Sequence, residues 1–310
     1  MRYRRWVAWL LGSIVLAVPA GTLLAQTQAA AVTAAAGSRT ASGSAPPAGA
    51  AAAVRAAPLV TDITPVAESK RGLPAPPMTP AMSRAATVKQ DAAQRLLSRL
   101  GRRRRQDGAI EADAGCTTAA CRAGLPAAGI LAGSQQAQQR SYFCGPATAS
   151  EMLNQLGVRL SQTAAARQLG TNASGTDWSD STGYPMPRVL NAHQTRNDYV
   201  AVGLPWSPTA HQMKTFETDL VTDINRDGGV PLAGNAYEVA GGPHLVGNPV
   251  NQTIMHWIDI RGYQNYGAVT DYEDSVHNAT SIGWGLDVPA YSTLPSSTMV
   301  DILGARGYDW

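Results

Sequence analysis

The stretch QQRSYFCGPATASEML, residues 138–153, decides how the rest of the chain is interpreted. Pro146 lies two residues after Cys144, and proline fits the first turn of a helix because its missing N–H has no partner to lose there. The apolar residues that follow recur at the spacing of one helix face: Met152, Leu153 and Leu156. The sequence therefore predicts a helix that begins beside Cys144.

The position of Cys144 favours a reactive thiol over a structural one. Aligned peptide groups give the N-terminus of a helix a partial positive charge, which stabilises a thiolate. A free thiol with a pKa of about 8.5 is mostly protonated at neutral pH, whereas a thiol at a helix start and beside an imidazole is mostly ionised. Cys144 is therefore the candidate nucleophile of the chain.

Three further residues complete a candidate catalytic set. His256 lies in TIMHWIDIRGY, a β-rich run with an apolar face, and Asp274 closes the next such run, AVTDYED. Gln138 lies six positions before Cys144, from where its amide N–H can reach an oxyanion alongside the backbone N–H of Cys144. A cysteine, a histidine and a carboxylate that orients the histidine form the cysteine version of the catalytic triad. Asp271 is an alternative for the carboxylate.

This set of motifs resembles one family. The pattern Q-x5-C-G-P-A before a helix, then H-W and G-Y in one strand, then a strand that ends in Asp, is similar to the papain-like peptidases of the bacteriocin-leader-processing type. Within them it is most similar to the stand-alone, secreted branch without a transporter. The resemblance covers residues 134–310 and implies four roles: oxyanion binding by Gln138, the nucleophile Cys144, the general base His256 and the orienting acid Asp274.

Two features depart from the pattern of that family. Ser275 follows Asp274 where the family usually has proline, and the interval between His256 and Asp274 is slightly long. The sequence therefore leaves the choice between Asp274 and Asp271 open.

The order of elements predicts an α+β domain over residues 134–310. Helices are predicted in SQTAAARQLG, with Ser161 as its cap, in MPRVLNAHQT, and in SPTAHQMKTFETDLVTDINRDGG, with Ser207 as its cap. DYVAVG predicts a short strand, three consecutive antiparallel strands follow in GVPLAGNAYEV, TIMHWIDIRGY and AVTDYEDSV, and AYSTLPSSTMVDIL closes with a helix. In the papain-like layout that the resemblance implies, the nucleophile helix packs against an antiparallel sheet that carries the histidine and the acid.

The first 133 residues have a different composition. Residues 1–29 have the basic head, apolar run and small residues of a secretory signal. Residues 30–80 consist mainly of Ala, Gly, Ser, Thr and Pro, which bury too little apolar surface to offset their ordering entropy, so we expect a disordered linker or pro-segment. Residues 81–133 predict a short basic helix, whose apolar face consists of Val88, Leu96, Leu97 and Leu100. We expect a secreted, extracellular protein, with retention at the cell envelope as an alternative.

The charge is divided unevenly along the chain. Residues 1–133 contain 16 Lys and Arg and 6 Asp and Glu, whereas residues 134–310 contain 9 and 16, so the net charges are +10 and −7. An acidic domain does not fit nucleic-acid binding, which needs a basic face. The basic arm with its run Arg102–Arg105 is a solvated linker, a pro-segment cut at that run and docked on the acidic domain, or a tether to an anionic wall or membrane surface.

The three cysteines fall into two groups. Cys116 and Cys121 lie close together just before the domain, and in an exported protein they most simply form a small disulfide loop. Cys144 then remains as a free thiol. The other two cysteines lack a second pair at metal-binding spacing, so we expect no zinc site. Apart from the signal segment, no stretch is apolar for long enough to cross a membrane.

Other residues have a structural and a functional interpretation. Trp178 and Trp284 stand in loops rich in Gly, Ser and Asp, and they either anchor these loops or form a wall for a peptide side chain. His244 lies in a Gly-Pro-rich loop before the strand of His256 and is an alternative cleft residue. His193, His211 and His277 are interpreted as surface, capping or loop residues.

These observations predict an exported cysteine peptidase that acts on a peptide or protein substrate. It uses Cys144, His256 and Asp274, with Gln138 at the oxyanion, and it needs no metal or organic cofactor. One alternative keeps the site but changes the acceptor, as in transglutaminase-like or deamidating acyl transfer. The other alternative is a peptide-binding domain without catalysis.

Overall fold

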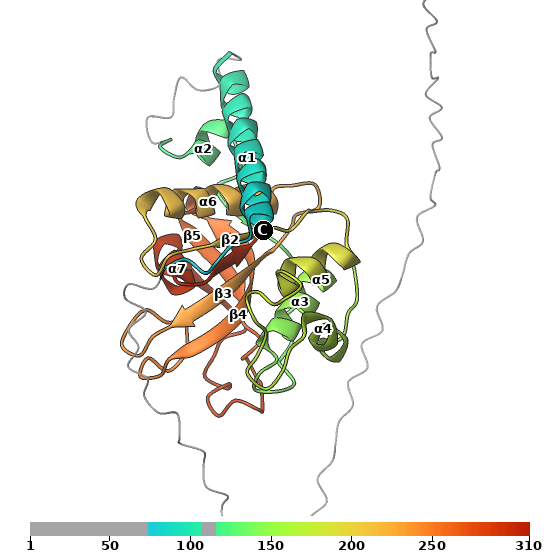
Figure 1. The fold of residues 1–310 in the computed structure, drawn as a ribbon. Coiled ribbons are helices and arrows are strands. Elements are labelled where there is room, and N and C mark those ends of the chain that lie inside the picture. The colour runs from blue at the N-terminus through green and yellow to red at the C-terminus, as the bar shows by residue number, and fades with distance from the viewer. Residues whose placement is uncertain (1–73, 107–115) are drawn as a thin grey trace, which may run out of the picture. The chain divides into compact units, whose positions relative to one another are not determined.

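The structure is a computed structural model, and it describes residues 74–106 and 116–310 (Figure 1). The predicted signal segment, residues 1–29, and most of the predicted linker lie outside the described residues. The chain divides into two units, residues 1–59 and 60–310, and every described residue belongs to the second. Among the described residues, no helix combines the length and the apolar content needed to cross a bilayer.

The described residues form a seven-stranded antiparallel sheet. Its strands are β1 (Gly129–Ile130), β2 (Ala201–Gly203), β3 (Leu232–Glu238), β4 (Ile254–Gln264), β5 (Val269–Glu273), β6 (Tyr291–Pro295) and β7 (Gly307–Asp309). The order across the sheet is β2-β7-β3-β4-β5-β6, and β1 pairs with the end of β4. The three predicted consecutive strands are β3, β4 and β5, and their antiparallel pairing is confirmed.

Helices cover both faces of this sheet, as Figure 1 shows. Beyond the sheet lie α3 (Cys144–Gln155), α4 (Gln162–Leu169), α5 (Pro185–His193), α6 (Ala210–Ile224), α7 (Ser296–Leu303) and the 3-10 turn η1 (Asn265–Gly267). Alternate residues of β3 enter two separate cores: Leu232 packs with α6 and α7, whereas Ala233 packs with α3 to α5. The α+β class predicted from the sequence is therefore confirmed.

Two local predictions need correction. Thr209, and not Ser207, caps α6, because Thr209 and Gln212 form a reciprocal capping box. The segment predicted as a closing helix begins as strand β6 and becomes helical only at Ser296, since Tyr291–Pro295 pairs along β5. The strand β7, which inserts between β2 and β3, has no signal of its own because it is three residues long.

The basic segment forms α1 (Pro80–Gln106), a helix of 27 residues. Its predicted apolar face is wrong in part: Leu97 is buried, but Val88 is 64% and Leu96 is 39% exposed. The buried stripe is instead made mostly of small residues: Ala86, Ala93, Leu97 and Gly101. Small side chains let the helix approach its neighbours closely, and a Cβ at Gly101 would lie 3.2 Å from a carbonyl oxygen of Arg122. Apolar periodicity does not detect such a stripe.

Polar contacts also hold α1 against the domain. Lys89 Nζ donates to Asn197 (2.8 Å) and to Asp223 (3.2 Å), and it lies 4.2 Å from the ring centre of Trp310. Gln90 donates to Asp219 at 3.0 Å. The basic arm therefore docks on acidic residues of α6 within the described part of the chain.

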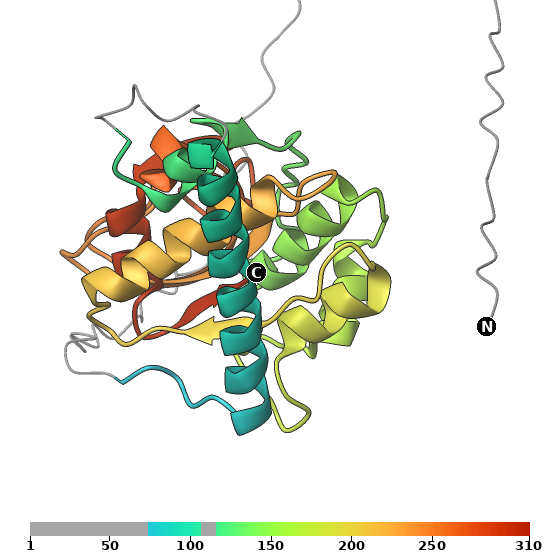
Figure 2. The ribbon, with the colours of Figure 1, turned by 90° about the horizontal axis from the view of Figure 1, so that it is seen from above.

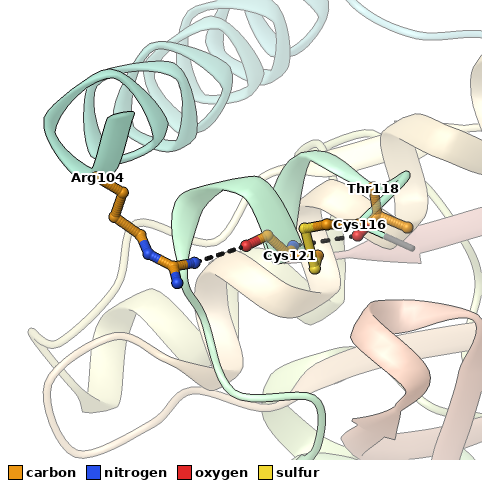
Figure 3. Close-up of a disulfide and its surroundings, with 4 residues drawn as sticks. All are labelled: Arg104, Cys116, Thr118 and Cys121. Atoms are coloured by element: carbon orange, nitrogen blue, oxygen red, sulfur yellow. Dashed lines mark hydrogen bonds between the residues drawn. A yellow bond between two sulfur atoms is a disulfide. The ribbon is translucent and has the colours of Figure 1, made fainter. Parts of the chain in front are cut away.

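A short helix, α2 (Ala119–Ala123), connects α1 to the sheet and carries a disulfide (Figure 3). Cys116 and Cys121 are joined, the pairing expected from their spacing. Thr118 caps α2 by accepting from the N–H of Cys121, and Arg104 of α1 donates to the carbonyl of Cys121 at 3.0 Å. The end of α1 is thus attached to the disulfide loop.

Candidate active site

Cys144 is the first residue of α3, as predicted. The N-terminal N–H groups of a helix have no partner within it, so they remain available at this end. A Cβ at position 145 would collide with Thr176, which explains why a glycine follows the cysteine: it lets the loop around Thr176 approach the helix start. Cys144 is the free cysteine of the chain, and the residue is 8% exposed to solvent.

His256 lies in β4, and Asp274 follows the last residue of β5. The Nε2 atom of His256 lies 2.8 Å from Oδ1 of Asp274, and both residues are buried. The N–H of Val276 donates to the same oxygen at 2.8 Å, which fixes the carboxylate in place. Because Nε2 is bonded to Asp274, Nδ1 is the ring nitrogen that remains for another partner.

That partner is Cys144, whose side chain forms a hydrogen bond with His256. Burial alone would raise the pKa of the Cys144 thiol. The hydrogen bond and charge of His256, with backbone N–H groups of Trp257 and Gly145, nevertheless hold this pKa below its ordinary value of 9.0. The thiolate is therefore favoured in spite of being buried.

The pKa of the His256 imidazole is shifted in the opposite direction, upward. Burial alone would lower the pKa of His256, but the charge and hydrogen bond of Asp274, followed by those of Cys144, raise it well above 6.5. A lowered thiol pKa and a raised imidazole pKa together favour a thiolate–imidazolium pair. This is the ionic state that a cysteine nucleophile requires.

The alternative acid, Asp271, lies elsewhere. It pairs in register with Gly262, and its Oδ1 lies 3.0 Å from the Arg261 guanidinium. The sequence could not separate Asp271 from Asp274, because both lie in one short run. The structure brings Asp274, and not Asp271, to His256.

Gln138 is buried close to this set, but its amide is already bonded. Its Nε2 donates to the carbonyls of Arg140 (2.8 Å) and Ser141 (3.0 Å), in the loop that precedes α3. Its backbone N–H donates to the carbonyl of Ser275 at 2.8 Å, next to Asp274. In this arrangement Gln138 connects the loop before Cys144 to the turn that carries Asp274.

Three of the other histidines have partners outside this set. Both ring nitrogens of His244 face backbone carbonyls, those of Gly242 and Gln252, so this residue holds its own loop. His277 contacts the carbonyl of Val288, and His193 contacts Gln168. The alternative role of His244 in the cleft therefore has no support in its contacts.

Cys144 and His256 line a cleft of about 290 Å³. One wall is the loop of residues 174–179, and Trp178 of this loop stacks on Trp257 with ring centres 6.0 Å apart. The interpretation of Trp178 as a cleft wall agrees with this position, whereas Trp284 does not line the cleft. Five other lining residues were not predicted from the sequence: Pro76, Pro77, Asn235, Met255 and Arg306.

A second group of ionisable residues lies nearby in the fold. Carboxylate oxygens of Glu151 (α3), Asp259 (β4) and Glu273 (β5) lie within 4.8 Å of one another, and all three residues are buried. Such spacing suits a cation, but N–H donors already contact these oxygens, from Gln136 at 2.7 Å and from Gln155 at 2.8 Å. Burial and the neighbouring carboxylates raise the pKa values of Glu151 and Asp259 well above their ordinary range, which favours shared protons.

Comparison with known proteins agrees with this geometry. Residues 131–284 match the model of a family described as the Peptidase_C39 like family, and this match includes Cys144, His256 and Asp274. No curated protein matches the chain at a significant level. The matched region holds α3 to α6 and β2 to β5, which carry both groups of ionisable residues and most of the residues that line the cleft. Residues 131–284 therefore form a papain-like α+β domain that belongs to the Peptidase_C39 like family.

Proposed function

We propose that this chain is a cysteine peptidase that hydrolyses peptide bonds with Cys144, His256 and Asp274. One observation carries the proposal: the thiol at the start of α3 is bonded to His256, whose Nε2 lies 2.8 Å from Asp274, and the thiol and the imidazole line a cleft. Membership of a peptidase family supports the same reaction class.

In the proposed reaction the Cys144 thiolate attacks the carbonyl carbon of a peptide bond. The imidazolium of His256 gives its proton to the leaving amine as the C–N bond breaks, which leaves a thioester on Cys144. Water then attacks the thioester carbonyl and gives a proton to His256, the acid product leaves, and the thiolate returns. Asp274 holds the ring orientation and stabilises the imidazolium through both steps.

Two groups are candidates for oxyanion binding. The backbone N–H of Cys144 is at the helix start, where no intrahelical partner uses it. Gln138 is the second candidate, and to act it must exchange one of its two carbonyl partners, at Arg140 or Ser141, for the oxyanion. We therefore expect the contribution of Gln138 to be smaller than that of a preformed donor.

We propose further that the protein acts outside the cytoplasm. The sequence of residues 1–29 supports export. The disulfide between Cys116 and Cys121 supports an oxidising environment, since thiols in the cytosol are kept reduced.

The test of the peptidase proposal uses the full chain, its Cys144→Ala variant and a mixed peptide library, with cleavage sites read by mass spectrometry. We expect cleavage by the wild-type chain and none by Cys144→Ala. An amine acceptor added to the same reactions separates hydrolysis from acyl transfer. Equal cleavage by both chains, or transfer to the amine without hydrolysis, would contradict the proposal.

A further inference from the structure

Part of the cleft wall is supplied by the chain's own N-terminal arm. Pro76 and Pro77 line the same 290 Å³ cleft as Cys144 and His256. They belong to residues 74–79, which we term the strap, and the strap ends where α1 begins at Pro80. Figures 1 and 2 both draw this segment beside β2 on its way into α1. The strap lies outside the residues that match the family.

Specific contacts hold the strap in this position. The N–H of Thr79 donates to the hydroxyl of Tyr184 at 2.7 Å, and that hydroxyl lies 3.4 Å from the carbonyl of Pro77. Met78 packs against the core formed by α3 to α5. Gly203, at the end of β2, allows this approach, because a Cβ there would lie 3.3 Å from Met78 and from Pro76.

The composition of the strap suits an occupant that stays extended. Prolines stand at positions 74, 76 and 77, and each proline fixes its own φ and keeps the preceding residue out of the helical region. Such a segment loses little conformational entropy when it is ordered. Peptides preorganised in this way fill aromatic-lined grooves, and the cleft offers Trp178 and Trp257 as aromatic lining.

The helix α1 fixes the end of the strap. Lys89 and Gln90 lie two to three turns into α1, and they bind Asp223 and Asp219 of α6. Tyr308 of β7 donates to the same carboxylate oxygen of Asp219 at 2.7 Å, so the helix is attached to the sheet as well. The strap is therefore held at one end by a docked helix and along its length by Tyr184 and the core.

We propose that the strap is an internal occupant of the substrate cleft, clamped by α1, and that it shields Cys144 until it is displaced. The identity of the cleft as the peptide-binding groove rests on the proposed function. The proposed shielding of the thiol does not depend on that function, since it is argued from Pro76 and Pro77 lining the same cleft as Cys144.

The test measures the reaction of Cys144 in the full chain with a bulky maleimide and with iodoacetamide, read by intact mass. The chain has three cysteines, and two of them form a disulfide, so the adduct reports on Cys144 alone. Met78→Asp places a charge against the apolar core that holds the strap. Val88→Asp is the matched control, the same kind of change at an exposed position of α1.

We expect Met78→Asp to react with the bulky maleimide about tenfold faster than the wild-type chain, a change of about 1.4 kcal/mol in strap docking. We expect a smaller increase with iodoacetamide, and no increase for Val88→Asp. A second variant, Pro76→Gly with Pro77→Gly, leaves the core untouched and makes the strap more costly to order, so it carries the test if Met78→Asp does not fold. Unchanged maleimide rates in the folded variants would overturn the proposal.

The same variants separate this proposal from the peptidase proposal. Faster alkylation of Met78→Asp without any peptide cleavage would support the strap proposal and contradict the peptidase proposal. Peptide cleavage at equal rates by the wild-type chain and by Met78→Asp would support the peptidase proposal and contradict the strap proposal.

Discussion

Two triplets of ionisable residues are built on the same three parts of the fold. The first consists of Cys144 (α3), His256 (β4) and Asp274 (after β5), and the second consists of Glu151 (α3), Asp259 (β4) and Glu273 (β5). All six residues are buried. In the first triplet the thiol pKa is lowered and the imidazole pKa is raised, so charged forms are favoured. In the second triplet the pKa values of two carboxyls are raised, so neutral forms are favoured.

The difference shows that the charge and hydrogen bonding of the neighbouring groups, and not burial alone, decide whether the charged or the neutral form of a buried group is stable. Desolvation is the largest influence on Cys144 and His256, as it is on Glu151 and Asp259. In the first triplet, groups of opposite charge and N–H donors outweigh it. In the second, three like charges add to it. Cys144 and His256 of the first triplet line the cleft, whereas no member of the second triplet does, which fits a catalytic role for the first and a structural role for the second.

The largest expected effect comes from removing the imidazole. We expect His256→Ala to lower the rate of peptide cleavage about 10⁴-fold or more, because the thiolate loses its counter-ion and the leaving amine loses its proton donor. Single-turnover cleavage of the best library peptide measures this. Conversion of Glu151 to Gln is the comparison in the second triplet and should change the rate less than about threefold. Comparable losses in both variants would remove the distinction between the two triplets.

The choice of acid gives the next largest effect. We expect Asp274→Asn to lower the cleavage rate about 10²-fold or more, since the imidazolium loses its charged partner. Asp271→Asn is the matched control in the same strand region; it breaks the contact with Arg261 and should change the rate less than about threefold. Steady-state rates of the two variants at one peptide concentration are sufficient. A larger loss in Asp271→Asn would assign the acid to the other carboxylate.

Gln138 provides an intermediate test. If its amide exchanges a backbone carbonyl for the oxyanion, Gln138→Ala should lower the rate about 10–100-fold, with less effect on KM. Gln139→Ala, at the adjacent position, is the control. A change confined to the melting temperature would mean that Gln138 only joins the loop of Arg140 to the turn of Ser275.

The smallest effect concerns the stability of the carboxylate triplet. The folded-state pKa of Glu151 is raised above its unfolded value, so its contribution is fully present below about pH 4.3 and is lost as the pH rises through the folded pKa. Glu151→Gln cannot ionise. We therefore expect the free energy of unfolding to fall with rising pH by about 1–3 kcal/mol more in the wild-type chain than in this variant.

Urea unfolding at several pH values above 5 measures this difference. Asp227→Asn, at an exposed carboxylate, is the control. If the free energy of unfolding of Glu151→Gln differed from that of the wild-type chain by the same amount at every pH, the Glu151 carboxyl would not hold a proton in the folded state.

The first triplet was accessible to sequence reasoning because each member lies in a distinctive local pattern. Cys144 precedes Gly-Pro at a helix start, His256 lies in a strand of alternating residues, and Asp274 closes the next strand. The second triplet was not predicted. Glu151 resembles a solvated residue of an amphipathic helix, and only the packing of α3 on β4 and β5 shows that it is buried.

The same distinction applies to the fold. The strands β3 to β5 have clear apolar patterns and were predicted, whereas β7 is short and is stabilised by pairing with residues far away in sequence. Apart from Met78 and Leu97, the strap and the buried face of α1 consist of small, polar and proline residues, which have no periodic apolar signal. Sequence patterns therefore predicted most of the long elements of the domain, but not its short strands or the surface on which the N-terminal arm docks.

The ionisation of Cys144 tests the central claim most directly. The rate of its reaction with iodoacetamide, measured from pH 4 to pH 10 in the full chain and in His256→Ala, reports the thiolate fraction. We predict a midpoint below 9.0 in the wild-type chain and a higher midpoint in His256→Ala, because burial is then opposed by the backbone N–H groups alone and no longer by the imidazole. Identical midpoints in the two chains would contradict the proposed thiolate–imidazolium pair.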